Sequence, residues 1–337
     1  MDTCALGPEH LTEILRNIWG ASCQLQSLED LNDGFAKKTY LLQVGHPDTR
    51  CILHIWAKPE HQLTEVETDA DWILGPNGSE QFGVNNTFLR DQGVPTPEVY
   101  ALDSTKSICE YDFALVEYIE GGNFTEFTQQ CDADTTQALL GRINEQLEKM
   151  HGLQAPRPGL LTQKRPSETR CERLVWQHTR LELDLACDYN EAIKSHKAQI
   201  LDALESLVDV IEPRSVFSLI HGELGPEHIL VSPASEPYFI DCEGARFFDL
   251  EYEHSLLRAR FRAQYSTFAR TDLDRHRMKF YTLTHSIGWA AFASEAVTRD
   301  SINRHWATGI MTSNTHEIIR LVCGSVDMVV WRGRADR

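Results

Sequence analysis

Apolar residues recur near the start of the chain at the spacing of a helix. The positions that share one helical face are Leu11, Ile14, Leu15 and Ile18. The pattern of apolar residues then changes from helical to strand-like. Residues 39–44 and 51–56 are short runs of apolar and β-favoured side chains. The turn signal GHPDT separates these runs, and Asp33-Gly34 marks an earlier turn. The pattern predicts a helix followed by an antiparallel hairpin.

The chain from about residue 30 to residue 120 reads as largely β, with one inserted helix. The segment TFLRDQG ends that helix at Gly93. Pro95 and Pro97 then keep the backbone extended and exclude a helix. Residues 108–122 predict two strand segments on either side of Tyr111-Asp112, stopped by a pair of glycines.

Beyond residue 122 the period is mainly helical. A stripe of apolar residues predicts a helix capped by Asp134 or Thr135. Further helices are expected over residues 175–186 and 200–211 and from Glu251 onward. A small hairpin over residues 219–244 interrupts them. We therefore predict an α+β, bilobal architecture: a β-rich N-lobe, residues 1–120, and a larger, mainly helical C-lobe, residues 121–337.

Composition narrows the class of partner. The net charge of −18 argues against nucleic acid or an anionic membrane as the main partner. It is compatible with a cationic small molecule, although an acidic surface more often serves solubility. The nine cysteines are scattered without a C-x-x-C pair, and no secretory signal or membrane-spanning run is visible. We expect a cytoplasmic protein with reduced thiols.

The hairpin over residues 219–244, LIHGELGPEHILVSPASEPYFIDCEG, carries the candidate chemistry. His221-Gly222-Glu223 forms a turn before one short strand, and a second short strand ends in Asp241. Antiparallel pairing of these strands would bring Glu223, His228 and Asp241 to one end. Such a cluster can hold a divalent cation and position a nucleophile, which are the main requirements of phosphoryl transfer.

This segment resembles the catalytic motif of the aminoglycoside phosphotransferase family, a branch of the protein-kinase-like fold. The family pattern is His-Gly-Asp, four residues, Asn, a strand, a loop and Ile-Asp. The spacing matches, with Glu223 in place of the catalytic Asp, His228 in place of the metal-binding Asn, and Asp241 unchanged. The resemblance implies a kinase that uses ATP with Mg²⁺ or Mn²⁺, with Asp241 and His228 as metal ligands. Downstream, Asp249 and Glu253 occupy acidic positions of the family.

The resemblance extends to the nucleotide site of the N-lobe. Gly34 falls in the loop that covers the nucleotide, and His54 falls where a lysine or arginine contacts the phosphates, with Lys58 shortly after it. Glu80 lies where the family has a helical glutamate that pairs with that cation. FALVEYIEGG resembles the hinge that receives adenine, which assigns the backbone from Glu117 to Ile119 to this role.

Three departures bear on activity. Glutamate for aspartate at position 223 moves the carboxylate oxygens by about 1.5 Å, and small displacements of catalytic groups are costly. Imidazole suits magnesium poorly, so His228 binds manganese, hydrogen-bonds a phosphate, or does neither. A neutral His54 would weaken the ionic contact with the α/β-phosphates. Glu80 could pair with His54 if that histidine is protonated.

Three functions fit these residues. The first is a kinase that phosphorylates a hydroxyl of a small metabolite or antibiotic-like molecule, with Glu223 orienting that hydroxyl. The second is a ligand-binding pseudokinase. The third is an enzyme that runs another group transfer, with Glu223 and His228 as an acid/base pair. Glu251 and Glu253 either line a pocket for a cationic substrate or stabilise the start of an acidic helix.

Overall fold

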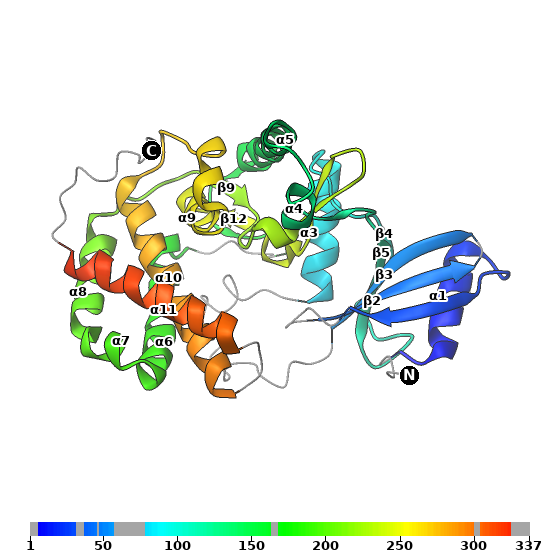
Figure 1. Ribbon diagram of the computed structural model, residues 1–337, viewed down its shortest axis with the longest axis horizontal. Helices are drawn as coiled ribbons and strands as arrows, with labels where there is room; N and C mark the ends of the chain where they lie inside the picture. Colours follow the sequence, from blue (N-terminus) through cyan, green and yellow to red (C-terminus); the bar gives the residue numbers. More distant parts are fainter. Residues whose placement is uncertain are drawn as a thin grey trace. The chain divides into compact units, whose positions relative to one another are not determined.

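The computed structural model describes residues 6–31, 37–45, 47–56, 78–162, 168–299 and 304–324 (Figure 1). Contacts divide the chain into two compact units. Unit 1 comprises residues 1–168 and 214–271, and unit 2 comprises residues 169–213 and 272–337. Among the described residues, no helix is both long enough and apolar enough to span a bilayer. Unit 1 takes in parts of both predicted lobes, and the boundary at residue 120 stays a prediction.

A five-stranded antiparallel sheet forms the first part of unit 1, in the order β1-β2-β3-β5-β4 (Figure 1). Its strands are β1 (Leu25–Asp30), β2 (Lys38–Gly45), β3 (Asp48–Trp56), β4 (Val99–Asp103) and β5 (Asp112–Glu117). The hairpin expected around GHPDT is therefore confirmed as β2 and β3. The predicted fold class is confirmed too, because this sheet is followed along the chain by mainly helical structure.

The two faces of this sheet pack against different helices. α1 (Pro8–Trp19) buries Leu11, Ile14 and Leu15 against one face, as the helical spacing predicted. The alternate positions of the strands face the other way, and there Trp56 and Val116 pack with Phe82 of α3 (Ser79–Asp91). Because side chains alternate along a strand, every second residue of β2 and β3 is presented on the α3 face.

The sequence prediction was wrong over residues 108–111. These residues form no strand: β5 begins at Asp112, and its neighbours in the sheet are β3 and β4. The reason is Asp103, whose carboxylate accepts the backbone N–H groups of Thr105, Ser107 and Ile108 at 2.8–3.1 Å. This local hydrogen bonding folds the segment into a turn and takes those groups away from a ladder.

The predicted hairpin over residues 219–244 is confirmed as β10 (Ile229–Val231) and β11 (Pro237–Phe239), which pair antiparallel. It packs in a core with α5 (Ala133–Gly152) and α9 (Leu250–Phe261). The carboxylate that caps α5 is that of Asp132, which accepts the Thr135 N–H at 2.7 Å. The cap therefore precedes both predicted residues, Asp134 and Thr135.

Short elements complete unit 1. β6 (Gly122–Asn123) joins the hairpin in a three-stranded sheet, in the order β11-β10-β6. A four-stranded sheet has the order β7-β9-β12-β8. The remaining segments are α4 (Phe124–Thr128), β7 (Gln154–Ala155), β8 (Gly159–Leu160), β9 (Phe217–Ile220), η1 (Pro226–His228), η2 (Cys242–Gly244), β12 (Arg246–Phe248) and η3 (Arg262–Thr267).

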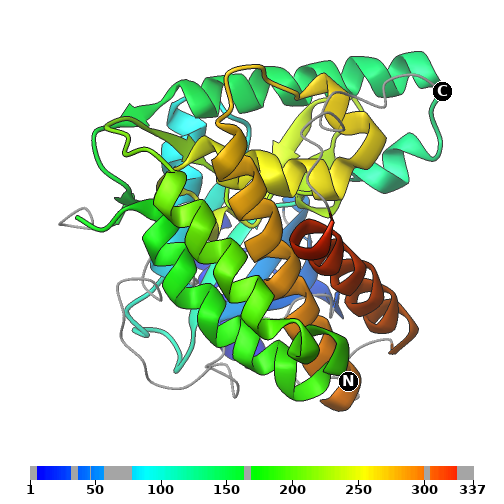
Figure 2. The same ribbon diagram turned by 90° about the vertical axis from the view of Figure 1, so that its left-hand side faces the viewer.

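Unit 2 is helical over its described residues (Figure 2). It contains α6 (Cys171–Tyr189), α7 (Glu191–Ser195), α8 (Lys197–Val210), α10 (Arg275–Arg299) and α11 (Arg304–Cys323). α10 packs against α6, α8 and α11. The helices expected over residues 175–186 and 200–211 are therefore confirmed as α6 and α8.

Candidate active site

The end of the β10–β11 hairpin holds two carboxylates on either side of one ammonium group. Lys37 Nζ lies 2.6 Å from Asp241 Oδ1 and 2.6 Å from Glu243 Oε1. Asp241 follows the hairpin in a left-handed backbone conformation (φ 58°, ψ 44°), which an aspartate tolerates and which often marks a functional site. Glu243 lies in the short helix η2 and is only 8% exposed.

The three charges depend on one another. Burial alone would lower the pKa of Lys37, but Glu243 and Asp241 outweigh it and raise that pKa. Burial works in the opposite sense on Asp241, yet Lys37 and His228 hold the pKa of Asp241 well below its ordinary value. Burial raises the pKa of Glu243, with Lys37 opposing and Asp241 adding to the rise. Asp241 is therefore the permanent anion of the pair, and Glu243 takes a proton more readily.

His228 meets Asp241, as the hairpin geometry predicted. Its Nε2 lies 3.4 Å from Asp241 Oδ2. Its Nδ1 lies 2.8 Å from the carbonyl oxygen of Glu223, and a carbonyl can only accept, so Nδ1 carries the proton. In the neutral imidazole, Nε2 then presents a lone pair beside the Asp241 carboxylate. This arrangement is suitable for one cation bound by both groups.

Glu223 contributes to the cluster through its backbone, whereas its side chain is exposed. Its carbonyl oxygen also accepts from Arg260 Nη1 at 2.8 Å. Arg260 passes so close to Gly225 that a Cβ at that position would collide with the guanidinium. The turn is thus braced from α9, and the Glu223 carboxylate is left free to face solvent or a bound molecule.

Beneath the turn, His221 and Gly222 are held by buried partners. The Ile240 carbonyl accepts from His221 Nε2 at 2.9 Å, and burial followed by the charge of His228 lowers the pKa of His221 to about 3. The Gly222 N–H donates to Glu253 Oε2 at 2.7 Å. His221 is therefore a neutral structural residue that connects the two strands which carry the acids.

The expectation that Glu251 and Glu253 line a substrate pocket is wrong. Glu251 is 2% exposed and accepts from Arg214 Nη2 at 2.9 Å, and Glu253 is 0% exposed. Burial raises the pKa of Glu253 to about 7, although the Gly222 N–H opposes the rise. Both acids occupy the first turn of α9, where sequence alone left the choice between pocket and helix start open.

His54 lies on the α3 face of the sheet, next to Lys37, Asp241 and Glu243, which we call the Lys37 cluster. Thr39 Oγ1 lies 3.1 Å from His54 Nδ1, and the Phe82 ring centre lies 5.7 Å away. Burial and then the charge of Lys37 lower the pKa of His54 to about 3, so its ring is neutral. The pairing of Glu80 with a protonated His54 is therefore wrong: Glu80 is exposed, and Phe82 occupies the inward position of α3.

The predicted hinge residues lie at the end of β5. Glu117 is the last residue of that strand, and its carboxylate accepts the Glu98 N–H at 3.0 Å. Ile119 follows and is buried. Their assignment to adenine concerns backbone groups and stays a prediction. Gly34 and Lys58 lie outside the described residues.

Residues 27–281 match the family model described as the phosphotransferase enzyme family, which covers most of the chain. The protein belongs to the phosphotransferase enzyme family. The resemblance read from the HGE…H and Ile-Asp motifs is thereby confirmed. No curated protein matches the chain at a significant level.

Solved structures confirm the fold of this family member. A thermostable mutant of aminoglycoside phosphotransferase APH(4)-Ia matches with a TM-score of 0.61 at 15% identity, covering 91% of this chain and 98% of that chain. Choline kinase LicA from Streptococcus pneumoniae matches with a TM-score of 0.60 at 15% identity, covering 93% and 99%. A ternary complex of an APH(4)-Ia mutant with ADP and hygromycin B matches with a TM-score of 0.57 at 13% identity, covering 91% and 98%.

Sequence reasoning missed three residues of this candidate site. Lys37 and Asp241 are 204 positions apart, and nothing local to either one announces the other. Glu243 was overlooked although it follows Asp241 by two residues. Asn85 of α3 donates from Nδ2 to the carbonyl oxygens of Cys242, Glu243 and Ala245 at 2.8–3.2 Å, which fixes η2 from the opposite side. The alternation of β2 was the one available signal, since it places Lys37 and Thr39 on the same face.

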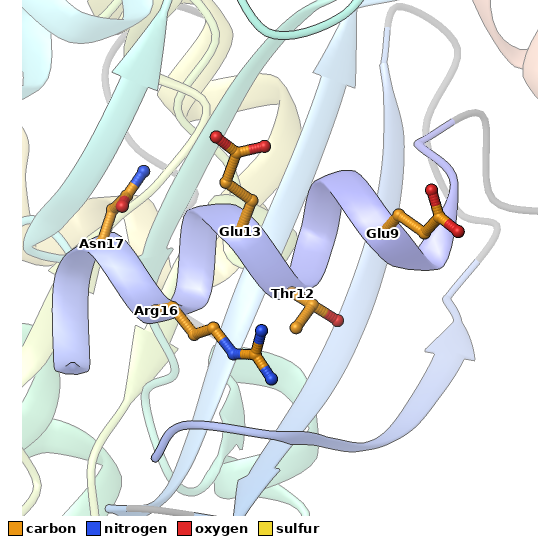
Figure 3. Close-up of a pocket in the computed structure, with 5 residues that line it drawn as sticks. All are labelled: Glu9, Thr12, Glu13, Arg16 and Asn17. Atoms are coloured by element: carbon orange, nitrogen blue, oxygen red, sulfur yellow. The ribbon is translucent and has the colours of Figure 1, made fainter. Parts of the chain in front are cut away.

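A separate surface pocket of the protein lies along α1 (Figure 3). The five residues that line it all come from that helix: Glu9, Thr12, Glu13, Arg16 and Asn17. None of them belongs to the Lys37 cluster. This pocket is therefore not part of the candidate active site.

Proposed function

We propose that the protein is an ATP-dependent small-molecule kinase that phosphorylates a hydroxyl group. The observation that carries the proposal is the pair Asp241 and Glu243, held 2.6 Å from one ammonium group at the end of the His221-Gly222-Glu223 hairpin. Two carboxylates that share one cation form a site with affinity for positive charge. Membership of the phosphotransferase enzyme family supports the reaction type. The APH(4)-Ia complex with ADP supports a nucleotide as the second substrate.

The residues of this site fit a divalent cation. Magnesium in phosphoryl-transfer sites is held by one or two carboxylates, and the substrate phosphates complete its coordination. Asp241 and Glu243 supply such carboxylates, and Glu243 Oε2 is buried with no hydrogen-bond partner among the described residues. His228 Nε2 adds a nitrogen donor, which suits manganese better than magnesium. In the described part of the chain, no group of three or more acidic, histidine or cysteine side chains is already arranged to coordinate a metal ion.

The transfer step follows from the position of Glu223. The substrate hydroxyl oxygen forms a bond with the γ-phosphorus as the bond to the β,γ-bridging oxygen breaks, and ADP leaves with that electron pair. The hydroxyl proton passes to the exposed Glu223 carboxylate. A divalent cation bound at Asp241 would neutralise the charge of the phosphates. Arg260 and His228 hold the Glu223 backbone, so that the longer glutamate side chain begins from a fixed point.

The nucleotide is proposed to place its adenine at the backbone between Glu117 and Ile119. Phe82 and Trp56 contribute apolar surface on the α3 face of the sheet. Because burial turns Glu251 and Glu253 inward, the acceptor is defined only by the hydroxyl that Glu223 can reach. The APH(4)-Ia complex with hygromycin B supports an antibiotic-like acceptor, and a small metabolite is the other class.

Transfer of the γ-phosphate tests the proposal. The purified protein would be incubated with γ-labelled ATP, Mg²⁺ or Mn²⁺, and a panel of amino alcohols, sugars and aminoglycosides, and labelled products would be separated. We expect one acceptor class to be labelled. Glu223→Gln should lower kcat by about 100-fold or more, because a general base contributes 10² to 10⁴.

The exposed Glu145 of α5 offers a matched control, since Glu145→Gln removes the same charge away from the cluster. Failure of the wild-type protein to bind ATP with either metal would refute the proposal. Binding without transfer to any acceptor would identify a ligand-binding pseudokinase. Transfer of a different group, lost in Glu223→Gln, would indicate the acid/base alternative.

A further inference from the structure

The phosphates of a nucleoside triphosphate need positive charge from the protein as well as from a metal ion. The β3 position that faces the cluster carries His54, whose ring is neutral and hydrogen-bonded to Thr39. A neutral imidazole in that place supplies no ionic contact to a phosphate. The cation must therefore come from elsewhere in the site.

Lys37 reaches the same place from the position immediately before β2, the strand next to β3. The register pairs Lys38 with Ile55 and Thr39 with His54, so Lys37 stands opposite Trp56 on the α3 face. Its Nζ lies 5.8 Å from the Trp56 ring centre and 5.5 Å from that of Phe82. The side chain is 9% exposed and ends between Asp241 and Glu243.

This position differs from that of a surface ion pair. A buried lysine loses hydration, and here two carboxylates and two aromatic rings compensate for that loss. Asp241 and Glu243 are also the residues expected to receive a metal ion. A metal ion held by these carboxylates would supply their compensating charge, and the Lys37 ammonium would then be available to the phosphates of the nucleotide. The flexible four-carbon stem allows such a shift of the ammonium group.

We propose that Lys37, the residue immediately before β2, is the phosphate-contacting cation of this protein and replaces a basic residue at the β3 position held by His54. This inference rests on the proposed function. It makes Lys37 a nucleotide-binding residue that also occupies the two carboxylates when nucleotide is absent.

Labelling of the wild-type protein gives the first test. An acyl-phosphate derivative of ATP transfers its acyl group to a lysine amine beside the terminal phosphate, with release of the nucleotide. Peptide mapping should find the acyl group on Lys37, and excess ATP should suppress it. Lys38 is the internal control because its side chain is exposed on the opposite face. Labelling of Lys58 in place of Lys37, or of neither residue, would overturn the inference.

Substitution gives the second test, with ATP and adenosine compared by calorimetry. Lys37→Met should weaken ATP binding by about 10- to 100-fold, the value of one lost hydrogen bond between charged groups. Adenosine binding should stay unchanged, because adenosine lacks phosphates, and this also shows that the variant is folded. Lys37→Arg should keep most of the affinity. Lys38→Met should match the wild type in both titrations.

Moving the cation back to β3 gives a rescue experiment. The double variant Lys37→Met, His54→Lys should recover part of the lost ATP affinity, because positions 37 and 54 lie on the same face of the sheet. Equal loss of ATP and adenosine binding in Lys37→Met would assign Lys37 a structural role and refute the inference. Unchanged ATP binding in Lys37→Met would refute it while leaving the kinase proposal intact. A wild-type protein that binds neither ligand would refute both.

Discussion

The tautomer of His228 determines which of its ring nitrogens could coordinate a metal ion beside Asp241. The Glu223 carbonyl fixes the proton on Nδ1, so Nε2 is the atom that faces Asp241 at 3.4 Å. Nitrogen donors favour manganese over magnesium. We expect His228→Asn, which supplies an oxygen donor, to improve magnesium-supported nucleotide binding relative to manganese by about tenfold. Calorimetric titration of nucleotide in each metal measures this ratio.

A suitable control for that substitution is His316→Asn, at an exposed histidine of unit 2, which should leave the ratio unchanged. An unchanged ratio in His228→Asn would show that His228 is not a ligand. The alternative role, a hydrogen bond to a phosphate, would instead appear as a similar loss of nucleotide affinity in both metals.

Asp241 is the other residue whose role can be isolated. Its pKa is held low by Lys37 and His228 against the effect of burial, so it is an anion at neutral pH. Asp241→Asn removes that charge and keeps the shape. Because a bound metal contributes several kcal/mol to a phosphoryl transfer, we expect a loss of at least about 100-fold in kcat. Metal-dependent thermal stabilisation by nucleotide should vanish as well, whereas Glu145→Gln should retain both properties.

The sequence identified some of these site residues and missed others for a physical reason. Glu223, His228 and Asp241 lie within one hairpin, where strand pairing alone brings two of them together. Lys37 lies just before β2, 204 positions from Asp241, and only tertiary packing brings the two together. The sequence alone does not show whether Glu251 and Glu253 are buried or exposed. Their burial depends on the packing of α9, which no local pattern reveals.

Asn85 connects two elements that the sequence keeps far apart. Its amide donates to three carbonyl oxygens of η2 and its side chain is buried, while its Oδ1 has no hydrogen-bond partner among the described residues. Asn85→Ala should lower the free energy of unfolding by about 2 kcal/mol, since the amide has two N–H donors and each hydrogen bond contributes about 1 kcal/mol. Urea unfolding measures the loss, and nucleotide affinity should fall because η2 carries Glu243.

Asn85→Asp makes the prediction sharper. It keeps the size of the side chain but turns a donor into a carboxylate facing three carbonyl oxygens, so it should be more destabilising than Asn85→Ala. Thr87→Ala, at an exposed position of the same helix, should change stability by less than about 0.5 kcal/mol. Equal stability of Asn85→Ala and Thr87→Ala would rule out a bracing role for Asn85.

At the level of elements, periodicity predicted the strands and helices that bury one face. α1, β2, β3, α6 and α8 were found because their apolar spacing matches a single period. The prediction failed where side chains bind their own backbone. Asp103 turns residues 104–108 into a loop, and Asp132 caps α5 before the apolar stripe begins. Hydrogen bonds of this kind leave no periodic signal.

For the molecule as a whole, the sequence indicated the order of β-rich and helical parts, but it did not indicate the two units. Unit 2 is assembled from residues 169–213 and 272–337, which are separated by the segment that carries the hairpin and α9. The spacing of apolar residues reports on structure formed between neighbours in the sequence. It cannot reveal that α10 packs against α6 across that insertion.

The stability of the whole molecule should depend on pH through Glu253. Burial raises the pKa of this carboxyl from 4.5 to about 7, so the folded state binds its proton more tightly than the unfolded state. The stabilisation is complete below pH 4.5 and is lost as pH rises through 7. We expect this group to remove about 3 kcal/mol of unfolding free energy over that window. Glu253→Gln, which stays neutral, should lack the loss.

Buried histidines, His54 and His221 among them, act in the opposite sense and have to be separated from it. His54 and His221 have pKa values of about 3 in the folded state, so they stabilise the protein above pH 6.5 and progressively less below it. Both remain in Glu253→Gln, and the difference in unfolding free energy between wild type and variant isolates Glu253. Urea unfolding at pH 5, 6, 7 and 8 should show a difference that grows with pH in favour of the variant. A difference that is constant across this range would mean that Glu253 does not titrate there, and that the Gly222 N–H and Arg246 stabilise its anion fully inside the core.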